Sequence, residues 1–295
     1  MSDKVDIAVR RLQEAAEMSQ MLYEKPLVIT YSGGKDSDTV LKLAQIAKIP
    51  FEVLHSHTTA DAPETVYHVR EMFRELELAG IKCDIDYHVR PDGTRTTMWN
   101  LIPKKMMPPT RIVRYCCAEL KEGGGKDRFI ATGVRWVESN ARKCRGSLEV
   151  IVPDKRRSLI LSNDNDEDRR LFESCKMKGK RVVNPIIDWT TEDVLDFCKS
   201  EKVSLCPLYG EGWHRVGCVG CPMAGKKRYI EFSRYPTYKK AYIAAFDRMI
   251  EERKRRGTKG NSAYGWETGN EVFHWWMEDG ILPGQTVIPW FEDIL

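Results

Sequence analysis

A short glycine turn between an apolar run and a helical pattern constrains the fold of this chain most strongly. The apolar run is Leu27–Tyr31, and the turn is Ser32-Gly33-Gly34-Lys35-Asp36-Ser37. Glycine lets a backbone approach an anion closely, and the first amides of a helix have no partner within that helix. The sequence therefore predicts a strand, an anion-binding loop and a helix in direct succession.

The turn differs from two common phosphate-binding loops. A Walker loop has four residues between its glycines and a Lys-Ser or Lys-Thr pair, and the dinucleotide loop has the spacing GxGxxG. Here Gly33 and Gly34 are adjacent, and Lys35 is followed by Asp36. If a nucleotide binds, Lys35 can neutralise its phosphates and Asp36 can hold Mg²⁺, although Asp36 could instead cap the helix.

The flanking segments alternate between strand and helix patterns. Strands separated by helices of this length predict a doubly wound parallel α/β sheet, with ligands at the carboxyl ends of the strands. The expected strands are residues 27–31, 51–55, 82–88 and 129–133. The expected helices are residues 5–22, 36–47, 63–78 and a segment that ends near residue 200 and follows a Thr-Thr cap.

The second half of the chain changes in character twice. Residues 142–180 have weak periodicity and many charges, which indicates an insertion or a mobile connection. Beyond Cys221 the pattern is helical and rich in aromatic residues. We therefore expect a nucleotide-binding domain over residues 1–222 and a helical, aromatic C-terminal extension over residues 223–295.

Composition indicates the compartment and the use of the cysteines. The chain has 295 residues, of which 42% are hydrophobic and 31% are charged, with a formal net charge of +4. No apolar run approaches the roughly 20 residues of a membrane span, and the first residues have no apolar signal core, so we expect a cytoplasmic protein without a membrane partner. In a reducing compartment the nine cysteines are expected to be metal ligands or reactive thiols rather than disulfides.

Two cysteine pairs stand about a hundred residues apart. They are Cys116-Cys117 and the CxxC pair Cys218-Val219-Gly220-Cys221. Four thiolates can hold a 4Fe-4S cluster or a zinc ion. The CxxC pair alone would equally fit a redox pair, half of a zinc site or an inert buried pair.

These motifs together resemble one superfamily. The turn is similar to the pyrophosphate-binding loop of the adenine nucleotide alpha-hydrolases, which include the N-type ATP pyrophosphatases and the PAPS and APS reductases. A Cys-Cys pair with a remote CxxC resembles the 4Fe-4S signature of the assimilatory APS reductases. Further segments resemble this superfamily in the same order, over roughly residues 27–222: Asp61-Ala62-Pro63-Glu64-Thr65, Gly133-Val134-Arg135, Asn184-Pro185-Ile186-Ile187-Asp188-Trp189 and Pro207-Leu208-Tyr209.

The resemblance implies a set of site residues. ATP, or APS or PAPS, would bind on Ser32–Ser37, with Lys35, Asp36 and Arg135 taking part in catalysis. Gly133, Arg135 and Arg142 would lie at the phosphate or sulfate, although Arg142 could instead form a surface ion pair. A 4Fe-4S cluster would be held by Cys116, Cys218, Cys221 and either Cys117 or Cys206, and zinc remains an alternative to iron and sulfide.

One departure from the reductases affects the expected activity. The reductases carry a Glu-Cys-Gly-Leu-His tail with a nucleophilic cysteine, and this chain has no cysteine after Cys221. We therefore expect ATP pyrophosphatase-type activation, in which an acceptor is adenylated, coupled to sulfur transfer from a donor protein. The alternative is an APS or PAPS reductase that uses an external thiol reductant.

A second alternative is a non-catalytic subunit that binds nucleic acid. Its phosphate contacts would come from the basic runs Lys226–Arg228 and Arg253–Lys259. Its stacking surfaces would be Trp266, Trp275 and Trp276, unless these side chains belong to a buried helix.

Overall fold

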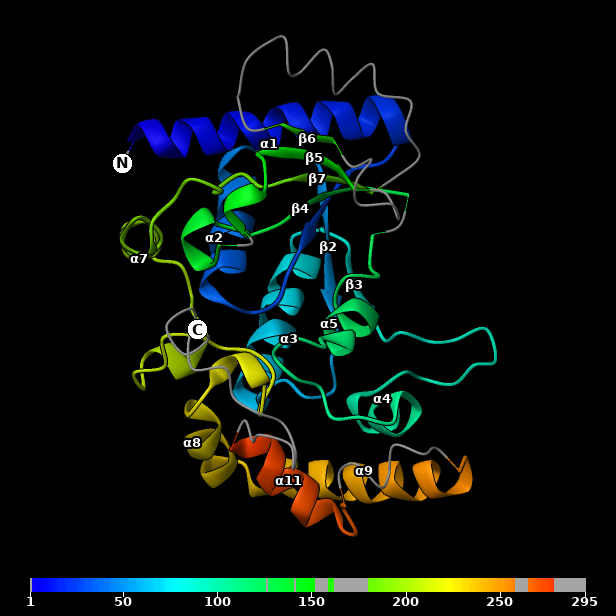
Figure 1. The fold of residues 1–295 in the computed structure, drawn as a ribbon. Helices are drawn as coiled ribbons and strands as arrows, with labels where there is room; N and C mark the ends of the chain where they lie inside the picture. Colours follow the sequence, from blue (N-terminus) through cyan, green and yellow to red (C-terminus); the bar gives the residue numbers. More distant parts are fainter. Residues whose placement is uncertain are drawn as a thin grey trace. The chain divides into compact units, whose positions relative to one another are not determined.

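The computed structural model of the protein describes residues 2–125, 127–140, 142–151, 159–161, 180–257 and 265–278. The chain divides into two compact units, each assembled from segments that are separated in the sequence (Figure 1). Unit 1 consists of Met1–His57, Ala62–Asp86 and Gly123–Gly217. Unit 2 consists of Thr58–Asp61, Tyr87–Glu122 and Cys218–Leu295.

This division differs from the boundary that we expected at residue 222. Residues 87–122 pack with the C-terminal helices rather than with the sheet on which the preceding strand ends. Local periodicity could not show this, because it identifies helices and strands but not the partners against which they pack.

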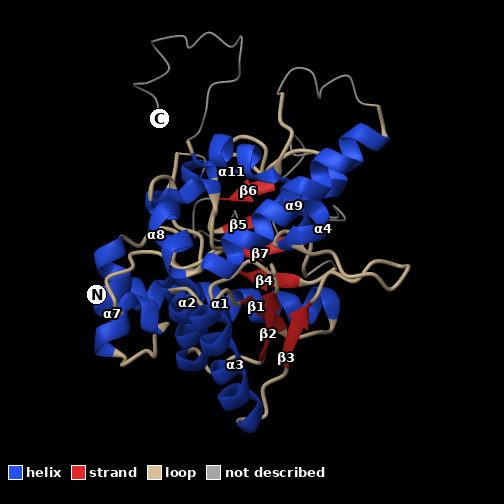
Figure 2. Ribbon diagram, turned by 90° about the horizontal axis from the view of Figure 1, so that it is seen from below, coloured by secondary structure: helices blue, strands red, loops and turns tan. Residues whose placement is uncertain are grey.

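Unit 1 is built on a seven-stranded sheet with the order β3-β2-β1-β4-β7-β5-β6 (Figure 2). The strands from β3 to β7 pair in parallel, whereas β5 pairs antiparallel with both β7 and β6. The predicted α/β fold class is therefore confirmed. The strands are β1 (Leu27–Thr30), β2 (Phe51–Ser56), β3 (Cys83–Asp86), β4 (Phe129–Ala131), β5 (Leu148–Ile151), β6 (Leu159–Leu161) and β7 (Lys180–Val183).

Helices of unit 1 pack on the sheet through a large apolar cluster. The α-helices are α1 (Ser2–Tyr23), α2 (Lys35–Ile46), α3 (Pro63–Leu78) and α7 (Thr191–Ser200), and the short 3-10 helices are η1 (Trp136–Glu138), η2 (Arg142–Cys144) and η4 (Pro207–Tyr209). Alternate strand residues point to opposite faces. Ile29 accordingly joins Leu12, Leu41 and Phe197 in the large cluster, whereas its neighbour Val28 joins a smaller one.

Three strands, β5, β6 and β7, were missing from the sequence expectation. Residues 148–151 and 159–161 were expected to lie in an insertion, yet they extend the sheet as β5 and β6. Strands of three and four residues are too short to show a clear alternation of apolar and polar residues, and the charged residues around them obscure this pattern further. Residues 152–158 and 162–179, which complete the expected insertion, lie outside the described residues.

Unit 2 is helical and has an aromatic core. Its helices are α4 (Met98–Lys105), α5 (Tyr115–Leu120), α8 (Lys227–Arg234), α9 (Pro236–Arg255) and α11 (Gly269–Met277), together with the 3-10 helix η5 (Pro222–Ala224). The rings of Tyr242 and Trp276 lie 4.8 Å apart, and Phe232 packs edge-on against Tyr242. The aromatic character expected for the C-terminal region thus forms a buried core.

No helix among the described residues combines the length and the apolar character that crossing a membrane requires.

Candidate functional site

The loop between β1 and α2 has the strand, turn and helix predicted from the sequence. Gly33 adopts φ +73°, and a Cβ atom there would lie 2.9 Å from Val69 Cγ2 and 3.0 Å from Thr65 Cγ2. Glycine is therefore required both by the backbone conformation and by the close approach of α3. Helix α2 begins at Lys35, so its first amides lie at the end of this loop.

Internal hydrogen bonds give the loop its shape. Ser37 Oγ donates to the Gly34 carbonyl at 2.8 Å and accepts from the amides of Gly34 and Ser32 at 3.2 Å each. The Lys35 amide donates to Tyr209 Oη at 3.0 Å. The motif Pro207-Leu208-Tyr209 does not by itself predict this contact between Tyr209 and the loop. The loop is thus held by its own Ser37 and by Tyr209, which belongs to the last sequence segment of unit 1.

Three charged side chains meet at the start of α2. Arg135 Nε lies 2.8 Å from Asp36 Oδ1, and Lys35 Nζ lies 3.5 Å from Asp36 Oδ2. The Asp36 Oδ1 and Arg135 Nε atoms are buried, and their pairing lacks hydrogen-bond alignment. Gly133 also lies here, because a Cβ atom on it would be 3.0 Å from the Asp36 carbonyl. The structure therefore brings Ser32–Ser37, Gly133 and Arg135 together.

Two of these residues depend on further contacts. Arg135 Nη1 donates to the Trp189 carbonyl at 3.3 Å, which fixes the buried guanidinium against the turn before α7. Arg142 forms an ion pair with Glu138, whose carboxylate also accepts from the Arg135 amide. Arg142 is thus linked to Arg135 through Glu138, and its expected contact with a nucleotide stays a prediction.

Behind the loop lies a buried polar network that was not predicted. Asp38 Oδ1 accepts from Tyr31 Oη at 2.6 Å and lies 3.1 Å from His68 Nε2. Burial raises the pKa of Asp38 above its ordinary value, and Oδ2 has no hydrogen-bond partner among the described residues. The network ties β1, α2 and α3 together directly beneath the loop.

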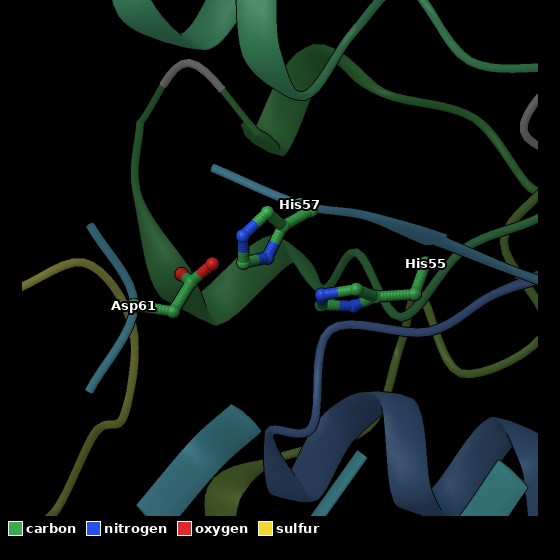
Figure 3. A group of neighbouring side chains, drawn as sticks. All are labelled: His55, His57 and Asp61. Atoms are coloured by element: carbon green, nitrogen blue, oxygen red, sulfur yellow. The ribbon is translucent and has the colours of Figure 1, made fainter. Parts of the chain in front are cut away.

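Two histidines lie at the carboxyl end of β2 (Figure 3). His55 Nδ1 donates to the Tyr31 carbonyl at 2.9 Å, and the rings of His55 and His57 are 6.3 Å apart between centroids. Asp61, which the same figure shows, belongs to unit 2, where it accepts from Thr58 Oγ1 at 2.6 Å.

Unit 2 gathers four cysteines from two distant segments. Cys116 and Cys117 lie on α5, and Cys218 and Cys221 flank the turn that leads into η5. Their charges act on one another: the pKa of Cys116 is raised by its hydrogen bond with Cys117, then by burial, and then by all three neighbouring thiolates. The sequence prediction that these two pairs meet is consistent with this arrangement.

Cationic side chains accompany the thiols. Arg114 Nη2 donates to Cys117 Sγ at 3.3 Å. The hydrogen bond from Cys116 and then the Arg114 guanidinium hold the pKa of Cys117 below its ordinary value, although burial opposes this. The charge of Cys218 raises the pKa of Lys121, with smaller contributions from Asp61 and the other thiolates. These cations compensate negative charge that four thiolates would otherwise concentrate.

Cys218 is held by the short segment Thr58–Asp61. The Val219 amide donates to the Ala60 carbonyl at 2.7 Å, and Cys218 pairs with Asp61 as an antiparallel bridge. Cys218 Sγ donates to Thr58 Oγ1 at 3.4 Å. Burial raises the pKa of Cys218 to about 12.

The spacing of the sulfurs distinguishes two kinds of metal site. Tetrahedral zinc with bonds of about 2.3 Å would hold its sulfur ligands about 3.8 Å apart. Across the described part of the chain, no three of these sulfurs lie within 4.8 Å of one another. A cubane cluster has wider-spaced ligands, because each sulfur binds an iron at a different corner. These sulfurs therefore do not form a compact tetrahedral group, and both a 4Fe-4S cluster and zinc stay predictions for this donor set.

The remaining described cysteines lie in unit 1. Cys206 is buried, with its sulfur 3.9 Å from Thr65 Oγ1, and Cys198 is buried beside Thr39. Burial raises the pKa of both thiols. Cys206 as a metal ligand stays a prediction, whereas Cys117 shares its unit with Cys116, Cys218 and Cys221.

Known sequences resemble this chain over most of its length. A sulfate adenylyltransferase subunit 2 from Streptomyces lavendulae is 30% identical over 239 residues, which cover 73% of this chain and 69% of that protein. An uncharacterized 37.8 kDa protein of Escherichia phage 186 is 30% identical over 173 residues, or 54% of this chain. The chain spans only 43% of the phage protein, and 59% of a second sulfate adenylyltransferase subunit 2, from Stutzerimonas stutzeri, which is 29% identical.

Solved structures show weaker similarity. A phosphoadenylyl-sulfate reductase from Candida auris has a TM-score of 0.44 and 15% identity over 72% of this chain and 93% of that chain. A U34-tRNA thiolase from Methanococcus maripaludis, solved with its 4Fe-4S cluster, has a TM-score of 0.36 and 12% identity over 84% of this chain and 80% of its own.

A family match covers the strands, the loop and both cysteine pairs. Residues 26–224 match the phosphoadenosine phosphosulfate reductase domain. The matched range begins at β1 and ends just after Cys221, close to the extent of the resemblance inferred from the motifs. This chain therefore belongs to the phosphoadenosine phosphosulfate reductase domain family.

Proposed function

We propose that this protein uses ATP to adenylate an acceptor and then transfers sulfur to it. The observation that carries the proposal is the presence, in one chain, of an anion-binding loop with Lys35, Asp36 and Arg135 and of a four-thiol group with its own cations. The name of the sulfate adenylyltransferase relatives describes adenylyl transfer, which supports the first half of the proposal.

The first step uses the charges around the loop. An acceptor oxygen attacks the α-phosphorus of ATP, a new P–O bond forms, and pyrophosphate leaves with the electron pair of the broken bond. Lys35 and the first amides of α2 stabilise the charge that builds up on the pyrophosphate. Arg135 is fixed by its bond to the Trp189 carbonyl and is therefore preorganised to hold a phosphate oxygen.

The buried atoms at the start of α2 suit Mg²⁺ as well as phosphate. Asp36 Oδ1 is buried, and its 2.8 Å contact with Arg135 Nε lacks the alignment of a hydrogen bond. Its lone pairs are therefore available to a hard cation. Asp36 would hold Mg²⁺, and the ion would supply positive charge between the phosphates.

The second step uses the thiols of unit 2. Hydrosulfide supplied by a donor protein attacks the carbon that carries the adenylate. A C–S bond forms, the C–O bond breaks, and AMP leaves with its electron pair. Cys116, Cys117, Cys218 and Cys221 would hold a 4Fe-4S cluster, which would supply a place to bind or relay sulfur. Arg114 and Lys121 balance the charge of the thiolates.

A second candidate is a sulfonucleotide reductase, which the family match favours. The same loop would then bind APS or PAPS instead of ATP, and an external thiol would supply the two electrons that release sulfite. The two candidates differ in the nucleotide consumed and in the product.

The test compares nucleotide products under anaerobic conditions. Purified protein is given ATP with sulfide and one of two acceptor preparations, namely total RNA or single-stranded DNA, and in a separate reaction it is given APS with dithiothreitol. We expect AMP and pyrophosphate in equal amounts from ATP with at least one acceptor. Lys35→Ala should lower this rate by roughly a hundredfold or more, because it removes a charge that stabilises the leaving group.

Matched variants separate the two steps. Asp84→Ala removes an exposed carboxylate of unit 1 and should leave the rate unchanged. Cys218→Ser should retain pyrophosphate release but lose both sulfur incorporation and the iron and sulfide found by chemical analysis. Production of sulfite from APS would contradict the proposal, and so would the absence of AMP formation from both ATP and APS. A colourless protein loaded with zinc would contradict the proposed cluster.

A further inference from the structure

Positive charge is concentrated in two segments of unit 2. Residues 87–122 and 218–257 together contain 18 Lys and Arg but only seven Asp and Glu. The whole chain has 47 basic and 43 acidic residues, so the rest of the chain is acidic on balance. A net charge so unevenly distributed indicates a polyanionic partner for the basic part.

The structure brings two basic helix ends to one place. Helix α4 packs along α9 (Figure 1), and Arg253 Nε donates to the carbonyl of Met106, which caps α4, at 2.6 Å. The two ends are separated by almost 150 residues in the sequence. We call this place the basic corner, and it consists of Lys104, Lys105, Arg253, Lys254, Arg255 and Arg256.

Folding alone does not account for this corner. Cations favour a helix C-terminus, but this effect is satisfied by one or two charges. Glu252 pairs with Arg255 and Arg256, and Glu119 pairs with Lys105. Lys104 and Lys254 are exposed, and Arg255 keeps 70% of its side-chain surface in solvent. The unbalanced like charges repel each other and lower stability.

Two aromatic side chains adjoin the corner. The Arg253 guanidinium lies 5.6 Å from the ring centroid of Trp266, and the rings of Trp266 and Trp275 are 4.9 Å apart. Both tryptophans are half-buried. Trp276 is buried in the aromatic core and Arg228 is only 1% exposed, so the structure removes these two residues from the surface proposed from sequence alone. Residues 258 and 259 of the second basic run lie outside the described residues.

We propose that the basic corner and Trp266 bind single-stranded nucleic acid, with phosphates on the cations and a base on the indole. Combined cations and aromatic rings are typical of sequence-tolerant binding to single strands. An anionic membrane would instead require exposed apolar side chains on the same face, and neither α4 nor α9 has an exposed large apolar residue. This inference rests on the proposed function and makes the adenylated acceptor a nucleic acid.

The test measures binding without turnover. Fluorescein-labelled 20-mers of oligouridine and oligothymidine are titrated with the full-length protein, and anisotropy is followed at several salt concentrations. The variant Lys104→Gln/Lys254→Gln/Arg255→Gln should bind at least tenfold more weakly, and its slope of log K against log salt should be shallower by about 2, since each lost phosphate contact contributes about 0.7. Trp266→Ala should weaken binding roughly tenfold without changing the slope.

A matched control removes the same charge elsewhere. Lys82→Gln/Lys199→Gln/Lys202→Gln changes three exposed lysines of unit 1 and should bind within twofold of the unmodified protein. Three results would each overturn the inference. They are equal weakening by both triple variants, no binding near 100 µM, a concentration at which nonspecific binders still associate, and tighter binding to phosphatidylserine vesicles. ATP binding is measured in parallel, so failure of the nucleotide loop and failure of the basic corner give different results.

Discussion

The phosphate loop of unit 1 and the thiol group of unit 2 are built in opposite ways. The loop is six consecutive residues, closed by hydrogen bonds from Ser37 to its own neighbours. The thiol group joins α5 to a turn about a hundred residues later, and the segment Thr58–Asp61 holds Cys218 in place. A contiguous loop depends on its own backbone, whereas a group assembled from distant segments depends on the core that holds them.

The difference predicts where each site is most vulnerable. Substitutions should affect the loop mainly when they touch its glycines, its charges or the Ser37 and Tyr209 hydroxyls that hold it. The thiol group should be lost through changes in the core of unit 2 that lie outside the cysteines.

The largest effect is expected from Arg228→Met. Arg228 donates to the carbonyls of Trp276 and Met277 in buried hydrogen bonds and to that of Gly225 in a partly buried one, and methionine would leave all three acceptors without this donor. The free energy of unfolding of unit 2 should fall by about 4 kcal/mol, and iron incorporation should fall with it. Urea denaturation followed by tryptophan fluorescence measures the first effect.

The control for this variant is Lys227→Met, which removes the same charge from an exposed neighbour. It should change the free energy of unfolding by less than about 0.5 kcal/mol. Equal losses in the two variants would show that the core of unit 2 does not depend on the buried guanidinium.

A smaller effect is expected from Gly33→Ala. The left-handed backbone costs about 1 to 2 kcal/mol for alanine, and the overlap with Val69 and Thr65 adds about 1 to 2 more. Gly80→Ala is the matched control, because Gly80 has φ +79° but open space around it, and it should cost only about 1 kcal/mol. Calorimetry should show loss of ATP binding in the first variant only, and retained ATP binding in both would separate the loop from the nucleotide.

The smallest effect concerns thiol ionisation in reduced protein stripped of metal. The pKa of Cys117 is lowered to about 5, so Cys117 is a thiolate between about pH 6 and 8 and its alkylation rate should stay nearly constant there. The Cys218 rate should rise about tenfold per pH unit, because burial raises its pKa to about 12. Mass spectrometry of iodoacetamide-treated protein measures both rates.

Arg114→Met sharpens this last test. Removing the guanidinium should raise the pKa of Cys117, so its alkylation rate should begin to depend on pH within the same window. An unchanged profile would mean that Arg114 does not stabilise this thiolate.

Contiguous features of the molecule were predictable from the sequence. The loop, α3 with Pro63 at its start and α7 with its Thr190 cap each depend on neighbouring residues, and the structure has all three. The partners were not predictable, because Tyr209 reaches the loop, and His68 reaches Asp38 behind it, only through the folded chain.

The sequence also misplaced one charge. The run Lys226–Arg228 predicts an exposed basic surface, yet Arg228 lies on the buried face of α8 with Phe232, and the buried Tyr235 follows at the end of the helix. The spacing of four and then three residues is helical, so the apolar pair could have indicated that Arg228 shares their face. A run of like charges says little about exposure when helical spacing turns one member inward.

The discontinuous makeup of unit 2 has a consequence during protein synthesis. Ribosomes add about 5 to 20 residues per second, so Cys116 and Cys117 emerge several seconds before Cys218, and Trp276 emerges later still. Throughout this interval the nascent polypeptide carries a vicinal dithiol without its partners, open to oxidants and to stray metal. The four cysteines can therefore come together in a folded unit 2 only after the ribosome has synthesised Trp276.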